Sequence, residues 1–341
     1  MDSSRIDRRD VGLTETPYKL LPDGSPSNLS INRLQLTGAS CATGSEVYSG
    51  ALFRDRVMRC YPDGVDGARA YESVMKSLEG SRELWNAGFS EVVEVLARDC
   101  FRIFYLLKTQ PSEFVAANRL SSGDASFWKG CRFVAVYGAF LVGEIGAYFE
   151  RRVNELLAES GLESLVVETT KTTITPSLLG RLRAVDARPP IFTYDFGSTR
   201  AKHGVLTSEG ATFKELDPTL MPTSAFESSD ALDATIRRMI VADVEEWSPN
   251  ATTPTTVSLC LSNNAVNERL HARGRYGILL KTSSDYRAWL AEKLSETLGR
   301  RVEVRLSNDA DAVAVLYSDR APYAAALTLG TAFGIGYSRA R

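Results

Sequence analysis

Apolar residues recur along the chain at two spacings, which predict helices in some stretches and strands in others. From Tyr71 to Leu107 they follow the helical period, as they do again from Ser229 to Trp247 and from Asp285 to Leu298. Short apolar or alternating runs bounded by turn residues are typical of strands instead. The helices predicted in this way span about 70–87, 89–108, 145–160, 177–185, 229–247, 285–298 and 312–317.

The predicted strands are short and mostly apolar. They span residues 31–36, 131–137, 165–168, 191–194, 255–262, 301–306 and 324–329. Residues 1–30 are polar and rich in turn formers, which predicts a loop or extended arm. The alternation of helices and strands predicts a mixed α/β protein.

Length and composition favour two lobes. The chain has 341 residues, of which 44% are hydrophobic, and this is enough for two substantial cores. The segment Asp186–Pro190 is the most linker-like point in the sequence. It lies directly before the stretch that carries the first functional motif.

Charge and cysteine usage exclude several classes of protein. A net charge of -2 argues against a general nucleic-acid binder. The five cysteines include no Cys-x-x-Cys pair, which favours reduced thiols over a disulfide framework or a zinc site. The polar N-terminus lacks the apolar core of a signal peptide, and the apolar run Phe133–Gly143 is too short to span a bilayer. We therefore expect a cytoplasmic protein without a membrane segment.

The stretch Ile191–Lys202 carries the first motif, Asp195-Phe-Gly197-Ser198-Thr199-Arg-Ala-Lys202. Two β-prone runs flank a small-residue turn whose backbone amides and hydroxyls can face an anion. Asp195 precedes the turn, where it could hold a hydrated Mg²⁺. Such turns also occur in ordinary hairpins. The stretch resembles the first phosphate loop of the actin, hexokinase and acetate-kinase superfamily, which implies nucleotide contacts from the glycine, Ser198, Thr199 and Lys202.

Two further motifs follow in order along the chain. Asn308-Asp309-Ala-Asp-Ala312 comes at the end of a predicted strand, and Thr328-Leu-Gly-Thr-Ala-Phe-Gly-Ile-Gly336 comes at the end of the next. The three motifs together resemble those of ROK-type sugar kinases. The resemblance implies that Asp309 is the general base for a sugar hydroxyl, that Asn308 binds the sugar, and that Gly330 and Thr331 cradle phosphate. A helix cap is the alternative interpretation of Asn308-Asp309.

The resemblance also implies a fold and an unusual order of its halves. ROK-type kinases have a two-lobed actin-like ATPase (ribonuclease H-like) fold, with mixed sheets flanked by helices. In that family an adenosine-binding strand–Gly–Gly–helix and a closing Leu-Leu-Gly helix follow the second phosphate loop. Here the matching segments, Gly138-Ala139 and Pro176–Gly180, lie upstream. We infer that the two halves of the family's chain occur here in swapped order, as a circular permutation. Proteins tolerate such permutations where the original termini lie close together at the surface. In the permuted chain, residues 1–188 together with 320–341 would form the nucleotide-binding lobe. Residues 189–319 would form the lobe that binds the sugar and carries the catalytic aspartate. The alternative is that residues 1–190 form an unrelated domain.

The sequence departs from the family at several points. Ala139 replaces the second glycine of the adenosine segment, and Ser198 replaces a glycine of the first loop. The zinc motif found in many ROK proteins is missing. The cluster that contains Asn263, Asn264 and Glu268 follows a predicted strand and either lines the sugar pocket or forms a surface loop.

The function that these motifs imply is an ATP- and Mg²⁺-dependent kinase acting on a sugar or polyol, with no nucleic acid or membrane partner. A non-catalytic nucleotide or sugar sensor, or a scaffold on the same fold, remains the alternative. The sequence does not decide which sugar is used or whether the chain forms a homodimer.

Overall fold

The chain divides into two compact units. In this computed structural model the described residues are 5–7, 18–19, 33–36, 43–61, 68–185, 187, 189–207, 212–248, 254–263, 265–266, 268–272 and 274–340. Unit 1 comprises residues 1–23, 172–319 and 340–341, and unit 2 comprises residues 24–171 and 320–339.

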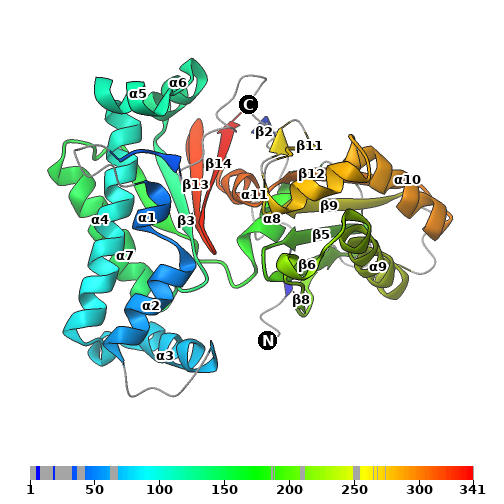
Figure 1. Cartoon of the computed structure of the whole chain (residues 1–341), viewed down its shortest axis with the longest axis horizontal. Coiled ribbons are helices and arrows are strands. Elements are labelled where there is room, and N and C mark those ends of the chain that lie inside the picture. Colours follow the sequence, from blue (N-terminus) through cyan, green and yellow to red (C-terminus); the bar gives the residue numbers. More distant parts are fainter. Residues whose placement is uncertain are drawn as a thin grey trace. The chain divides into compact units, whose positions relative to one another are not determined.

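Many elements of the two units are labelled in Figure 1. Residues 1–23 and 172–319 contain β1 (Arg5–Asp7), β2 (Tyr18–Lys19), α8 (Pro176–Arg183), β5 (Ile191–Phe196), β6 (Arg200–Leu206), β7 (Thr212–Glu215), β8 (Thr219–Leu220), the 3-10 helix η4 (Thr223–Ala225), α9 (Ser229–Trp247), β9 (Thr255–Leu261), β10 (Ala265–Val266), β11 (Arg269–Leu270), the 3-10 helix η5 (Arg275–Lys281), α10 (Tyr286–Leu298), β12 (Val302–Asn308) and α11 (Asp309–Leu316). The remaining elements are α1 (Gly44–Val47), α2 (Gly50–Cys60), α3 (Ala68–Gly80), the 3-10 helix η3 (Arg82–Leu84), α4 (Ala87–Thr109), α5 (Ser112–Asn118), α6 (Ser122–Gly130), β3 (Phe133–Tyr137), α7 (Gly143–Glu159), β4 (Val166–Thr169), β13 (Tyr323–Leu329) and β14 (Phe333–Ala340).

The sheet of unit 1 combines an antiparallel meander with two parallel strands. Along the sheet the order is β1-β7-β6-β5-β9-β12, where β5, β6 and β7 are antiparallel and β9 and β12 run parallel to β5. Three antiparallel strands followed by two parallel ones form the ribonuclease H-like arrangement that the sequence predicts. The register places Asp195 opposite Lys202 on β6 and opposite Cys260 on β9.

Different side chains cover the two faces of this sheet. Phe192, Tyr194 and Leu259 join α9 and α10 in one apolar core. The other face, which carries Thr193, Asp195, Ser258 and Cys260 at alternating positions, is more polar. Helix α8 contacts Asp195 and Ser258 on that face through Ser177 and Arg181.

The sheet of unit 2 has a related topology. The strands β14, β13, β3 and β4 lie side by side in that order, with β13–β14 antiparallel and β13, β3 and β4 parallel. In unit 1 the hairpin β5–β6 precedes the parallel strands along the chain. In unit 2 the hairpin β13–β14 follows them, although it takes the same place beside the first parallel strand. The predicted α/β class, with mixed sheets flanked by helices, is therefore confirmed.

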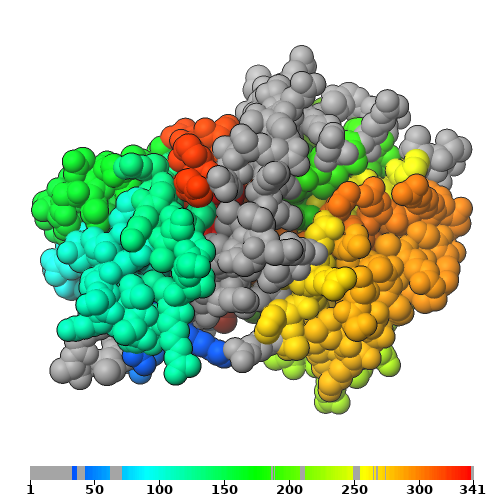
Figure 2. All heavy atoms as spheres, turned by 90° about the horizontal axis from the view of Figure 1, so that it is seen from above, coloured from blue at the N-terminus to red at the C-terminus, as the bar shows by residue number. Residues whose placement is uncertain are grey.

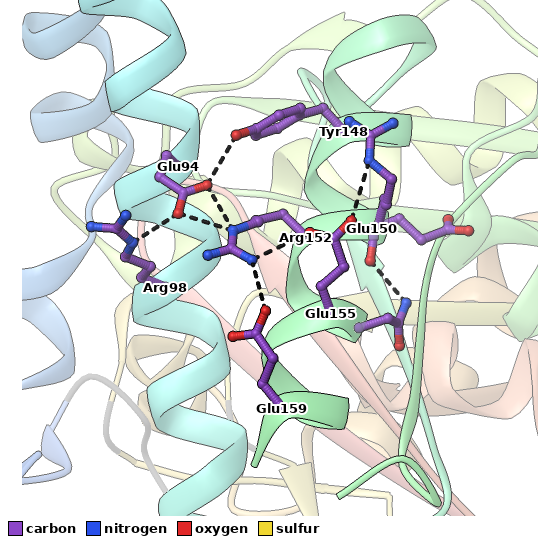
Figure 3. A network of polar contacts seen from close by, with 9 residues as sticks. Glu94, Arg98, Tyr148, Glu150, Arg152, Glu155 and Glu159 are labelled. Atoms are coloured by element: carbon purple, nitrogen blue, oxygen red, sulfur yellow. Dashed lines mark hydrogen bonds and ion pairs between the residues drawn. The ribbon is translucent and has the colours of Figure 1, made fainter. Parts of the chain in front are cut away.

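Helices α4 and α7 pack together in unit 2, and an ion-pair network around the buried Glu94 joins them (Figure 3). The Glu94 carboxylate accepts hydrogen bonds from Arg98 Nε at 2.8 Å, Arg152 Nε at 3.0 Å and Tyr148 Oη at 3.0 Å. Glu94 is 8% exposed, so a lone carboxylate there would be costly. Its three donors balance that cost, and the hydrogen bonds to Arg152 and Tyr148 tie α4 to α7.

Helix α8 belongs to unit 1, although the sequence analysis places its residues in the lobe of residues 1–188. Its leucines, Leu178, Leu179 and Leu182, are buried with Ile191 and Leu206 of the unit 1 sheet. These contacts lie within unit 1, which begins again at residue 172 and not at residue 189.

Most long elements agree with the sequence prediction, and the differences are local. The helix predicted over 70–87 ends at Gly80, and α11 starts at Asp309, not at Ala312. Residues 33–36, within the strand predicted at 31–36, contribute only an isolated bridge between Gln35 and Thr43. Helices α2, α5 and α6 were not predicted. None of the described helices is long and apolar enough to cross a membrane.

Candidate functional site

The turn between β5 and β6 directs its carbonyl groups into the protein. The carbonyl oxygen of Gly197 accepts a hydrogen bond from Tyr276 Oη at 2.7 Å. The carbonyl oxygen of Ser198 accepts from the amide of Thr223 at 3.0 Å and from its hydroxyl at 3.2 Å. The amides of Ser198 and Thr199 donate to no group among the described residues. Because this turn is partly exposed, these two amides can bind an anion.

Asp195 is buried beside this turn and uses one of its two oxygens internally. Its Oδ2 accepts hydrogen bonds from Ser177 Oγ at 2.7 Å and from Lys202 Nζ at 3.3 Å. In the described part of the chain, Oδ1 has no hydrogen-bond donor. The carboxylate is therefore held through one oxygen, while the other is available to a ligand.

Asp309 begins α11, directly after strand β12. Asn308 is the N-cap, and its Oδ1 accepts from the amides of Ala310 at 2.8 Å and Asp311 at 3.3 Å. The Nδ2 of Asn308 donates to the carbonyl of Asn263 at 3.0 Å. The helix cap considered for this pair is thus a role of Asn308. Asp309 is left half-buried in the first turn.

The Asp309 carboxyl lies within electrostatic reach of Asp195. Burial is the largest cause, and the negative charge of Asp195 the second, of a pKa of Asp309 that is raised to about 7. The Ala310 amide and the Lys202 ammonium oppose this shift. Two carboxylates and one ammonium therefore share this end of the unit 1 sheet. A carboxyl whose pKa lies near neutral pH can take up and release a proton under working conditions.

The groups beneath the two carboxylates were not identified from the sequence. Cys260 is buried, and this burial is the main reason why the pKa of its thiol is raised well above the usual value. The negative charges of Asp195 and Asp309 raise it further. Arg181 is only 3% exposed, and its Nε donates to Ser258 Oγ at 2.9 Å. The sequence contains one indication of these groups. Ser177 and Arg181 are four residues apart, so they share a face of a helix whose other positions are largely apolar.

The two carboxylates fit Mg²⁺ better than a transition metal. The described residues contain no group of three or more His, Cys, Asp or Glu side chains that could hold a metal ion. Mg²⁺ keeps several waters and is usually bound through one or two carboxylates together with substrate phosphates. The available Oδ1 of Asp195, beside two backbone amides that donate to no described residue, matches that requirement.

Two of the residues predicted to bind a sugar, Asn263 and Glu268, also have protein partners. Asn263 Nδ2 donates to the carbonyl of His271 at 2.8 Å. Glu268 pairs with Arg287 and Arg305 at 3.5 Å each. Arg287 belongs to α10, the helix drawn in orange on the face seen in Figure 2. Asn264 lies outside the described residues. Among the described residues, neither Asn263 nor Glu268 is hydrogen-bonded or ion-paired to Asp309.

Unit 2 brings its own two glycine loops together. The parallel register of β3 and β13 pairs Tyr137 with Thr328, so Gly138-Ala139 follows β3 beside the loop at Gly330 and Thr331. A Cβ atom built on Gly138 would lie 3.3 Å from the carbonyl oxygen of Leu329. Glycine thus permits a close approach of two segments that are almost 200 residues apart in sequence.

The chain was compared with family models, curated proteins and solved structures. A scan against protein-family models finds no match, and no curated protein is significantly similar in sequence. Among solved structures, an inorganic polyphosphate/ATP-glucomannokinase from Arthrobacter sp. strain KM is 22% identical, with a TM-score of 0.33, and the match covers 44% of this chain and 58% of that chain.

Two other solved structures match over a larger share of the chain. The ethanolamine utilization protein EutJ from Carboxydothermus hydrogenoformans is 14% identical over 64% of this chain and 72% of its own, with a TM-score of 0.31. An exopolyphosphatase-like protein is 14% identical over 73% of this chain and 86% of its own, with a TM-score of 0.28. No residue role follows from likenesses at this level.

Proposed function

We propose that this chain is an ATP-dependent kinase that transfers the γ-phosphoryl group to a hydroxyl of a sugar or polyol. The observation that carries the proposal is the electrostatic proximity of Asp309 to Asp195. Asp195 lies beside the β5–β6 turn, where the amides of Ser198 and Thr199 donate to no described residue. An anion site, a candidate metal ligand and a proton acceptor are thus gathered in unit 1. Phosphoryl transfer requires little more than positioning and charge neutralisation.

The proposed roles follow from the chemistry of each group. Ser198 and Thr199 bind phosphate oxygens through their amides, and Lys202 adds a positive charge. Asp195 holds Mg²⁺, which when bound neutralises charge on the transferred phosphoryl group. Asp309 accepts the proton of the substrate hydroxyl, while the oxygen of that hydroxyl bonds to the γ-phosphorus. The bond from that phosphorus to the bridging oxygen breaks, and ADP leaves with the electron pair.

For unit 2 we propose nucleotide contacts from Gly330, Thr331, Gly138 and Ala139. Their support is the close approach of the two glycine loops. A sugar or polyol is the partner that this proposal needs, and neither nucleic acid nor a membrane takes part. A cytoplasmic location and the sugar contacts of Asn308, Asn263, Asn264 and Glu268 remain part of the proposal.

A permuted ROK-type architecture is the second part of the proposal. Its support is the position of the hairpin β13–β14, which takes the place of β5–β6 in its sheet yet comes last along the chain. A rearranged chain that places residues 189–341 before residues 1–188, joined by a flexible linker, should keep a similar melting temperature. A rearranged chain that fails to fold would contradict the permutation.

The activity is tested by ATP consumption against a panel of sugars and polyols. We expect turnover with at least one compound, and Asp309→Ala should abolish that turnover while leaving ATP binding intact. ATP binding without turnover on any compound would favour the sensor or scaffold. Unchanged turnover of Asp309→Ala would exclude Asp309 as the base.

A further inference from the structure

Ser177 contributes to the candidate site from outside all three sequence motifs. It lies in the first turn of α8, and its hydroxyl donates to Oδ2 of Asp195 at 2.7 Å. Ser177 is 1% exposed and Asp195 is 5% exposed. A hydrogen bond from a hydroxyl to a buried carboxylate is short and about twice as strong as one between neutral groups.

The helix that carries Ser177 is held firmly in unit 1. Before its first residue, Thr175 donates to Glu215 from its amide at 3.0 Å and from its hydroxyl at 2.5 Å. One turn after Ser177, Arg181 reaches Ser258, and at the end of the helix Arg183 Nη1 donates to the carbonyl of Leu316 at 2.6 Å. Contacts along its whole length therefore determine where the Ser177 hydroxyl lies.

Both donors to Asp195 approach the same oxygen. Ser177 and Lys202 both reach Oδ2, from α8 and from β6 respectively. Two donors from two different elements therefore hold Oδ2. Oδ1 accepts no hydrogen bond from the described residues and is available to a ligand.

We propose that Ser177 is a positioning residue of this site, whose hydroxyl holds Oδ2 of Asp195 so that Oδ1 can bind the hydrated Mg²⁺ of a nucleotide. The inference rests on the proposed function in that it takes Asp195 as the metal ligand, but it concerns binding and not turnover. Groups that orient a metal ligand from behind typically change metal affinity by about 10–100-fold when they are removed.

The test is the binding of Mn²⁺ with ADP to the full chain, measured by electron paramagnetic resonance of the free ion. Ser177→Ala should weaken Mn²⁺ binding in the presence of ADP by about tenfold or more. Ser177→Thr, which keeps a hydroxyl, should restore part of that loss. Circular dichroism and the melting temperature establish that each variant is folded.

The matched control is Ser258→Ala, which removes another buried hydroxyl on the same sheet face and disturbs α8 through Arg181 without touching Asp195. Equal weakening by Ser177→Ala and Ser258→Ala would show a general loosening of α8 and would overturn the proposal. So would unchanged Mn²⁺ binding by Ser177→Ala, or wild-type protein that does not bind Mn²⁺ with ADP.

The kinase proposal fails separately. If the wild type binds Mn²⁺ with ADP but shows no turnover on any sugar or polyol, the kinase activity is excluded. Selective loss of binding in Ser177→Ala would still support the positioning role in that case.

Discussion

The carbonyl oxygen of Ala312 in α11 lies directly against Gly180 in α8. A Cβ atom built on Gly180 would come within 1.7 Å of that oxygen, far inside van der Waals contact. The two helices can approach this closely only because residue 180 has no side chain. Their approach matters for the candidate site, because α8 carries Ser177 and α11 begins with Asp309.

Gly180→Ala should force α8 and α11 apart. Because the obstacle is backbone and not a flexible side chain, we expect a loss of roughly 1–3 kcal/mol in the free energy of unfolding. Denaturant unfolding measures this loss. Gly80→Ala is the control, since a Cβ on this helical glycine meets nothing within 4 Å, and it should be neutral or slightly stabilising. Equal effects of the two substitutions would contradict the close packing of α8 on α11.

Asp309→Asn should raise stability at alkaline pH. Burial and the Asp195 charge raise the pKa of Asp309 to about 7, against about 3.9 in an unfolded chain. Between these values the folded chain binds more protons than the unfolded chain, so this group lowers stability as pH rises from about 4 to about 7. Asparagine does not ionise. The melting temperature of Asp309→Asn relative to wild type should therefore increase from pH 5 to pH 8.

Asp311→Asn is the control for this effect, because it removes a second carboxylate from the same first helical turn. Both substitutions remove a negative charge that interacts favourably with the helix dipole, an interaction worth about 0.3–1 kcal/mol. The control therefore measures this loss separately. A pH-independent difference between Asp309→Asn and wild type would show that the Asp309 carboxyl has an ordinary pKa.

Asp243→Asn should lower the pKa of His203. Burial by itself would lower this pKa, but the hydrogen bond from Nδ1 to Asp243 at 2.7 Å, the Asp243 charge and the Asp217 carbonyl at 2.9 Å raise it overall. The charged imidazole thus stabilises the fold fully below about pH 6.5, and this contribution is lost as pH rises through the higher folded pKa.

Imidazole NMR measures this shift directly, and the assignment is simple because the chain has two histidines. In wild type, the His203 resonance should titrate above pH 6.5, and in Asp243→Asn it should titrate at a lower pH. A His203 resonance that titrates below pH 6.5 in wild type would exclude the charged pair.

Tyr276→Phe should weaken phosphate binding at the first loop. The change removes only the hydroxyl that donates to the Gly197 carbonyl at 2.7 Å, so the peptide can turn and the neighbouring amides lose their fixed direction. We expect a loss of about 0.5–1.5 kcal/mol in the free energy of unfolding and a measurable increase in the Kd for ADP by calorimetry. Tyr61→Phe, which removes a similar hydrogen bond to Leu84 O at 3.2 Å in unit 2, should leave that Kd unchanged.

The sequence motifs locate the residues of the candidate site but not the residues that surround them. Asp195 and Asp309 both lie at strand ends as expected, and they influence each other electrostatically. Glu268, which stays a predicted sugar contact, is also paired with two arginines. Those arginines lie on α10 and β12, distant in sequence, so no local pattern could reveal the pairing.

The sequence by itself determined the type of most elements and the position of the phosphate-loop and Asn308-Asp309 motifs. These depend on the local spacing of apolar residues and on turn residues, whose preferences act within a few positions of the chain. The tertiary structure alone decided that Ser177 holds Asp195, that Tyr276 holds the turn at Gly197, and that Asp309 has a raised pKa. Each of these depends on segments remote in sequence being brought together and buried, which no local preference encodes.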